Sequence, residues 1–217
     1  MPDLKPLERR DTYHRYLDAA EALFIRYGYE GASIRMISRE ARAPLGTLHH
    51  YWGNKEVLFR DTCDRRFGPI QQEQLRRLRL CEQRMRAGLP LSLADVVRSL
   101  IEPPILADVD SPEKQHRIRL LYGRALTEPS EVVMRLVKEM FFEATALFTT
   151  LLRQQCTALD DETFYWRCNC VLGAFIFSQS FGDRMAYVLQ KSLADTDWRF
   201  VVDEIVAFVV RGMAVPA

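Results

Sequence analysis

The sequence predicts an all-α protein of about nine helices, with an N-terminal helix-turn-helix domain followed by a larger helical domain. Apolar residues recur at three- and four-residue spacing through almost the whole chain. No strand-like alternation bounded by turn residues competes with that pattern. Glycine, proline and capping residues divide it into segments of helical length. We expect the two domains to cover residues 1–54 and 55–217.

The first two helices are defined by their end signals. Apolar residues recur from about Arg9 to Tyr27, and Gly28 then supplies a C-terminal stop. Ser33 is a plausible N-cap for a short second helix that runs to about Ala41.

The third and fourth helices follow directly. Pro44 opens the third, since proline is tolerated in a first turn, and Gly53 ends it. Asn54 then caps a helix that begins "KEVLFRDTC" at Lys55. Two short helices joined by a few residues, after a longer one, predict a helix-turn-helix.

The second half contains five longer helical patterns. We expect Pro103-Pro104 to break the first of them. They run over about residues 91–106, 111–126, 130–158, 160 to beyond 173, and 198–213.

Composition is that of an ordinary globular protein: 217 residues, 48% hydrophobic and 27% charged, with net charge +1. No apolar run approaches the roughly eighteen residues of a membrane span. The polar start, "MPDLKPLERRDTYHRY", has no apolar core of a secretory signal, so we expect a cytoplasmic protein. The scattered cysteines form no C-x-x-C pair and the histidines have no ligand spacing, which favours reduced thiols over a metal site. The sequence calls for no cofactor.

A local basic patch lies within this near-neutral chain. Between residues 33 and 55, Arg35, Arg39, Arg42 and Lys55 stand against Glu40 alone. Such a patch suggests a localised anionic partner, although a solvated helix face can look the same.

The third helix carries several ring side chains in succession. Leu48 and Trp52 lie four residues apart and can pack inward together. Thr47, His49 and His50 then lie on the outer arc, where they can contact a phosphate or base edges in a DNA major groove. A solvated aromatic surface is the alternative.

Lys55 stands at the first position of the fourth helix, where free backbone N–H groups already concentrate positive charge. A bound phosphate at this helix N-terminus would make the lysine favourable. We therefore prefer phosphate contact over a solvated lysine.

The stretch "YLDAAEALFIRYGYEGASIRMISREARAPLGTLHHYWGNKEVLF" resembles the DNA-binding domain of the TetR family of bacterial transcriptional repressors, over about residues 12–66. The resemblance rests on A-x-x-L-F-x-x-x-G-Y, S-I-x-x-I, G-T-L and N-K-E. It implies a homodimer on a palindromic double-stranded DNA operator. The positions that usually touch the operator are Ser33, Arg35, Thr47, His49, His50, Tyr51 and Lys55.

This chain departs from the family pattern in its turn and third helix. Arg42 replaces a glycine, which costs roughly 1 kcal/mol if the backbone keeps a positive φ. Pro44 replaces the capping serine, so a side-chain N-cap is lost. The order His49-His50-Tyr51 replaces an aromatic-aromatic-histidine order, and Trp52 replaces a smaller aromatic.

"RLLYGRALTEPSEVVMRLVKE", residues 119–139, loosely resembles a branch with fatty-acid-responsive repressors, which implies a small hydrophobic ligand. The helix over 130–158 is apolar on more than one stripe, as in a core or a cavity wall. Polar residues within apolar runs mark a pocket, and the arginines suit an anionic head group or an internal salt bridge equally. The candidates are Arg119, Tyr122, Arg124, Met140, Trp166 and Asn169.

The last two helices carry small residues such as Gly173 beside Phe175 and Phe177, which suits close helix approach. The family resemblance implies that these helices pair the subunits. No nucleophile–base pattern, P-loop or dinucleotide fingerprint indicates an enzyme. We therefore expect a ligand-responsive DNA-binding repressor. The alternatives are a helical protein-interaction module and a regulator with no small-molecule inducer.

Overall fold

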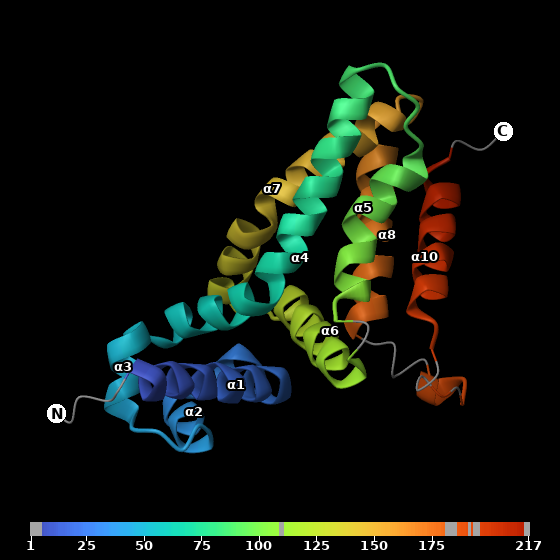
Figure 1. Cartoon of the computed structure of the whole chain (residues 1–217). Coiled ribbons are helices and arrows are strands. Elements are labelled where there is room, and N and C mark those ends of the chain that lie inside the picture. The colour runs from blue at the N-terminus through green and yellow to red at the C-terminus, as the bar shows by residue number, and fades with distance from the viewer. Residues whose placement is uncertain (1–5, 109–110, 181–185, 191, 193–195, 215–217) are drawn as a thin grey trace. The chain divides into compact units, whose positions relative to one another are not determined.

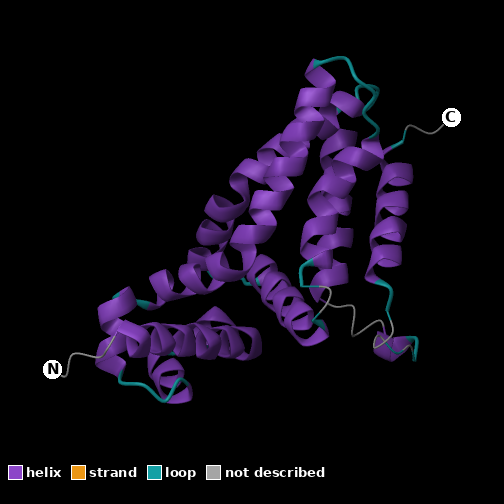
Figure 2. Ribbon diagram, viewed as in Figure 1, coloured by secondary structure: helices purple, strands orange, loops and turns teal. Residues whose placement is uncertain are grey.

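A computed structural model describes residues 6–108, 111–180, 186–190, 192 and 196–214. Every regular element in this part of the chain is a helix (Figure 2), which confirms the all-α prediction. The helices are labelled in Figure 1. They are α1 (Pro6–Gly31), α2 (Ile34–Glu40), α3 (Leu45–Trp52), α4 (Lys55–Arg86), α5 (Leu93–Leu106), α6 (Pro112–Thr127), α7 (Glu131–Gln155), α8 (Asp161–Ser180) and α10 (Trp198–Met213).

The chain forms two compact units. The N-terminal unit comprises residues 1–68 and 124–137, and the C-terminal unit comprises residues 69–123 and 138–217. The last turn of α6 and the first turns of α7 therefore pack with α1–α4. The predicted boundary between a DNA-binding domain (residues 1–54) and a second domain (residues 55–217) concerns function, and it stays a prediction.

Several helices begin directly after a residue whose side chain caps them. The Ser33 hydroxyl accepts a hydrogen bond from the Met36 N–H and caps α2. Asn54 Oδ1 accepts one from Val57 N (2.9 Å) at the start of α4. Asp197 caps α10, whose bounds are those that the sequence predicts. Side-chain acceptors at these positions satisfy N–H groups that the first helical turn leaves unpaired.

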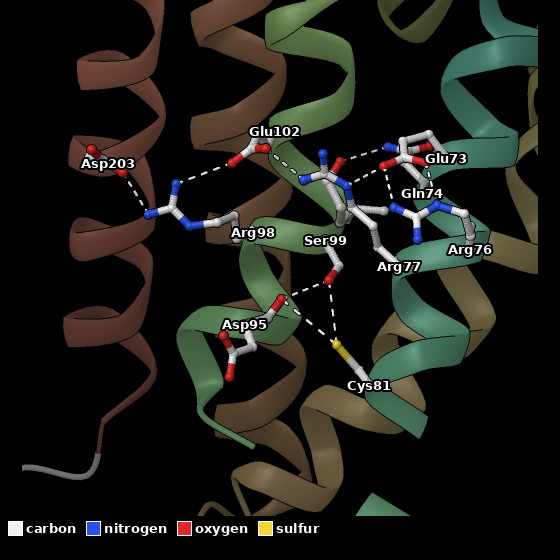
Figure 3. Close-up of polar contacts among 11 residues, drawn as sticks. Glu73, Gln74, Arg76, Arg77, Cys81, Asp95, Arg98, Ser99, Glu102 and Asp203 are labelled. Atoms are coloured by element: carbon white, nitrogen blue, oxygen red, sulfur yellow. Dashed lines mark hydrogen bonds and ion pairs between the residues drawn. The ribbon is translucent and has the colours of Figure 1, made fainter. Parts of the chain in front are cut away.

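The predicted break at Pro103-Pro104 is wrong, since α5 continues to Leu106. Proline at position 104 has no N–H to give to the carbonyl of Leu100. Gln74 of α4 replaces it, because its Nε2 donates to Leu100 O at 2.6 Å (Figure 3). A neighbouring helix therefore compensates for the proline.

A buried carboxylate joins α1 to α4 within the N-terminal unit. The Glu21 side chain is fully buried, and Arg65 Nη2 and Arg66 Nε donate to it at 2.6 and 2.7 Å. A buried charge is tolerated only when it is paired and hydrogen-bonded in this way.

Helix α1 changes direction at Gly28, which has φ +73° and ψ 179°. The sequence predicted a stop there, and Gly28 does leave helical geometry, but a further turn runs to Gly31. The N–H of Tyr29 donates to Glu128 Oε2 at 3.2 Å, and Arg124 pairs with the same carboxylate. The α6–α7 corner thereby holds the end of α1.

A chain of ion pairs links α4, α5 and α10 in the C-terminal unit (Figure 3). Arg98 bonds Asp203 of α10 at 2.6 Å and Glu102 at 3.2 Å. Arg77 of α4 bonds Glu102 and Glu73, each at 2.6 Å. The half-buried members of this chain fix α5 between α4 and α10.

Candidate nucleic-acid interface

The turn between α2 and α3 has the two departures expected from its sequence. Arg42 has φ +48°, the left-handed region that favours glycine. Pro44 precedes α3 without any side-chain cap, as predicted. The Tyr16 hydroxyl donates to Pro44 O at 2.6 Å, so α1 holds the turn in place of the missing cap.

The inward face of α3 is anchored as predicted by Leu48 and Trp52, which are 0% and 5% exposed. Trp52 Nε1 donates to Asp61 at 2.7 Å, and its ring stacks on Tyr13 at 4.9 Å. The Tyr13 hydroxyl also donates to Asp61. Burial, reinforced by this bond, raises the pKa of Tyr13 to about 12. These contacts fix the angle at which α3 presents its other face.

The outward face of α3 carries His49 and His50, both exposed. Thr47 and Tyr51 are half-buried, and the Tyr51 ring contacts the Tyr13 and Tyr16 rings. His49 Nδ1 lies 3.0 Å from Gly53 O. A carbonyl only accepts, so Nδ1 carries the proton, and in the neutral ring Nε2 faces outward as an acceptor.

Lys55 lies at the N-terminus of α4, but its ammonium already has protein partners. Nζ donates to Tyr29 O at 2.9 Å, lies 4.2 Å from the Tyr29 ring centroid and is 3.8 Å from Glu30 Oε2. One N–H of the Lys55 ammonium thus donates to the Tyr29 carbonyl at the end of α1. An ammonium has three N–H donors in total. Ser33 and Arg35, at the start of α2, are exposed.

The residues proposed for a ligand pocket differ in their burial and contacts, and their assignment to a pocket stays a prediction. Tyr122 is buried against the rings of Phe141 and Phe175, at 5.2 and 5.9 Å. Arg119 is buried and its guanidinium lies 4.0 Å above the Trp198 ring.

The other four candidates are less enclosed. Arg124 belongs to the N-terminal unit and pairs with Glu128. Met140 is half-buried, and Trp166 and Asn169 are exposed on α8.

Two residues with structural hydrogen bonds, Glu128 and Gln74, were not predicted from the sequence. Glu128 follows the α6 helix without a pattern that reveals its bond to Tyr29. Gln74 did carry a signal, because it stands in the buried stripe Phe67–Ile70–Gln74–Leu78 at helical spacing. A glutamine at an apolar position of that kind indicates a specific polar partner.

Two family models match the chain. One, described as bacterial regulatory proteins of the tetR family, matches residues 17–62 and so contains α2 and α3. The other, a tetracyclin repressor-like C-terminal domain, matches residues 98–212, more than half of the chain. The chain belongs to the TetR family. It is therefore a DNA-binding transcriptional regulator, in a family whose members are not enzymes.

A curated relative matches part of the chain, and solved structures share its fold. The A-factor receptor protein of Streptomyces griseus is 33% identical over 63 residues, which span 29% of this chain and 23% of that receptor. A TetR-like regulator from Rhodococcus sp. RHA1 has a TM-score of 0.60 at 20% identity, covering 99% of this chain and 100% of the other. FadR from Bacillus subtilis, in complex with stearoyl-CoA, has 0.59 at 13% identity, covering 92% and 98%.

Among the described residues, no helix is both long and apolar enough to cross a membrane.

Proposed function

We propose that this TetR-family chain is a homodimeric repressor that binds a palindromic operator through α3 and leaves it when a small hydrophobic molecule binds. The observation that supports it most is the division of α3 into two faces. Leu48 and Trp52 fix the helix inward, while the exposed His49 and His50 face outward. A helix held rigidly with free donors and acceptors is what major-groove recognition requires.

Each exposed residue has a distinct expected role in this complex. The Nε2 acceptor of His49 suits a base-edge amino group, and His50 reaches a neighbouring base. Ser33, Arg35, Thr47, Tyr51 and Lys55 contact phosphates or fix the approach of α3.

Exposed apolar residues on α8 and α10 support the homodimer. Trp166 and Phe177 of α8 are 61% and 47% exposed, and Phe208 of α10 is 66% exposed. A row of large exposed apolar side chains on adjacent helices suits a self-complementary interface. Trp166 and Asn169 then belong to this interface rather than to a pocket.

The hydrophobic ligand is proposed from the family and from the apolar interior around Tyr122. The complex of Bacillus subtilis FadR with stearoyl-CoA supports the general class of ligand. The ligand acts by favouring a state that binds the operator less well.

Selection from random duplexes with the full chain tests the DNA-binding part. We expect inverted repeats with half-sites one helical turn or somewhat more apart, and affinity that falls steeply with salt. Recovery of no preferred sequence, with binding insensitive to salt, would instead favour a protein-interaction module.

Sedimentation tests the dimer. Phe208→Asp should yield monomers at micromolar concentration, because it places a charge in the proposed interface. The matched control is Phe142→Asp, since Phe142 is 63% exposed on α7 and outside the α8–α10 row. A monomeric wild type, or equal effects of the two variants, would refute the assigned interface.

A further inference from the structure

The C-terminal unit contains a buried polar atom that lacks a hydrogen-bond partner. Gln74 of α4 is 1% exposed, yet its Oε1 has no partner among the described residues. An unpaired buried acceptor carries a large desolvation cost, so native proteins rarely leave one unmatched.

The orientation of this amide is determined by its neighbours. Nε2 donates to Leu100 O, the carbonyl that Pro104 leaves unmatched (Figure 3). The same side chain hydrogen-bonds Tyr122 in the sense that lowers the pKa of the phenol, while burial, the larger effect, raises it. Turning the amide over would set Oε1 against a carbonyl oxygen, so Oε1 is the atom left without a donor.

A complementary donor lies one turn earlier on the same helix. The Nε2 atom of Gln71 is buried and also has no partner among the described residues. Residues three apart occupy the same face of a helix. This face of α4 therefore offers one unmatched acceptor and one unmatched donor.

The described surroundings of Gln74 are mostly aromatic. Tyr122 from α6, Phe141 from α7 and Phe175 from α8 form a cluster of rings beside Gln74. The guanidinium of Arg119 lies over Trp198, and Arg77, one turn after Gln74, is paired with Glu73 and Glu102.

We propose that the C-terminal unit binds a neutral apolar molecule with a hydroxyl group at Gln71 and Gln74. The hydroxyl donates to Gln74 Oε1 and accepts from Gln71 Nε2, so one group satisfies both atoms. A carboxylate accepts from Gln71 but sets negative charge against Gln74 Oε1. This inference rests on the proposed ligand-responsive function, and it gives the ligand a neutral hydroxyl group where the sequence suggested an anionic head group or an internal salt bridge.

Three probes of nearly equal size separate these chemistries. Octan-1-ol donates and accepts, its isomer 1-methoxyheptane only accepts, and octanoate at pH 8 is an anion. Titration calorimetry of the full chain should give octan-1-ol an affinity about 5- to 150-fold above that of the ether, the factor for a buried hydrogen bond gained. Octanoate should bind more weakly than octan-1-ol.

Variants locate the site. Gln71→Leu should weaken octan-1-ol and 1-methoxyheptane alike, by about 2- to 10-fold, because both oxygens lose the hydrogen bond that Gln71 Nε2 donates, and the preference for the alcohol should remain. Gln72→Leu is the matched control, since Gln72 is exposed on the same helix and should leave both affinities unchanged. Using Gln71 avoids disturbing the Gln74 bond that supports α5.

Three results would overturn the inference: equal affinities for alcohol and ether, as a buried water on Gln74 would produce; tighter binding of octanoate; or binding of none of the probes. Operator binding is measured separately. If the alcohol binds as expected but DNA is not released, the site stands and the proposed release mechanism fails.

Discussion

Substitution of Gly28 by alanine tests the joint that holds the end of α1. At φ +73° an L-residue costs about 1–2 kcal/mol. A Cβ at this position would also overlap Arg124 Nη2 and come within 2.6 Å of Glu128 Oε2. Moving Glu128 Oε2 also breaks its buried hydrogen bond from Tyr29 N, which adds about 1–3 kcal/mol. We therefore expect a loss of about 2–5 kcal/mol of unfolding free energy.

Gly53→Ala separates the two contributions to this loss. Gly53 has φ +69°, but a Cβ there would meet nothing within 4 Å. Its variant should lose only the conformational part, about 1–2 kcal/mol. Urea unfolding followed by circular dichroism measures both variants. Equal losses would refute the conclusion that Gly28 is required by the contact with Arg124 and Glu128.

Three further substitutions test single features. Arg42→Gly should stabilise the chain by about 1 kcal/mol in the same urea assay, because the left-handed backbone no longer carries a Cβ; no gain would contradict the strain. Asp61→Ala should cost about 1–3 kcal/mol, since it leaves the Trp52 indole N–H without its acceptor; Asp64→Ala, at an exposed site, is the control. Hydrogen bonding, chiefly from Arg76, lowers the pKa of Glu73 from 4.5 to about 2. The ionised Glu73 carboxylate therefore adds less than about 1 kcal/mol to the unfolding free energy, because its site is partly exposed. This stabilisation is present above pH 4.5 and is lost as the pH falls towards 2. Glu73→Gln should therefore differ most from wild type near pH 7, and a difference that grows on acidification would contradict this assignment.

Helix ends were predictable where a local signal determines them. Ser33 and Asn54 each cap the helix that follows with their own side chain, so the sequence alone is sufficient. The positive φ at Arg42 was also predictable, but only through the resemblance to a family with glycine there.

Features that depend on distant residues were not predictable in the same way. Helix α5 passes through Pro104 because Gln74, thirty residues earlier, supplies the missing donor. The last turn of α1 exists because Glu128 accepts from Tyr29 across 99 residues. Periodicity and caps describe neighbours in sequence and contain no information on such bonds.

The candidate interface was predictable in outline but not in its contacts. The inward pair Leu48 and Trp52 followed from helical spacing. The use of Lys55 by Tyr29 did not, because a free helix N-terminus looks the same in sequence with or without that bond.

The most direct test of DNA reading by α3 compares variants on one selected operator and its single-base changes by fluorescence anisotropy. His50→Ala should relax the preference at one base pair by about 1–3 kcal/mol and leave affinity for scrambled DNA nearly unchanged. Lys55→Ala should weaken all sequences alike and reduce the salt slope by about one. If His50→Ala weakened every sequence equally while Lys55→Ala changed base preference, the proposed reading of DNA by α3 would be contradicted.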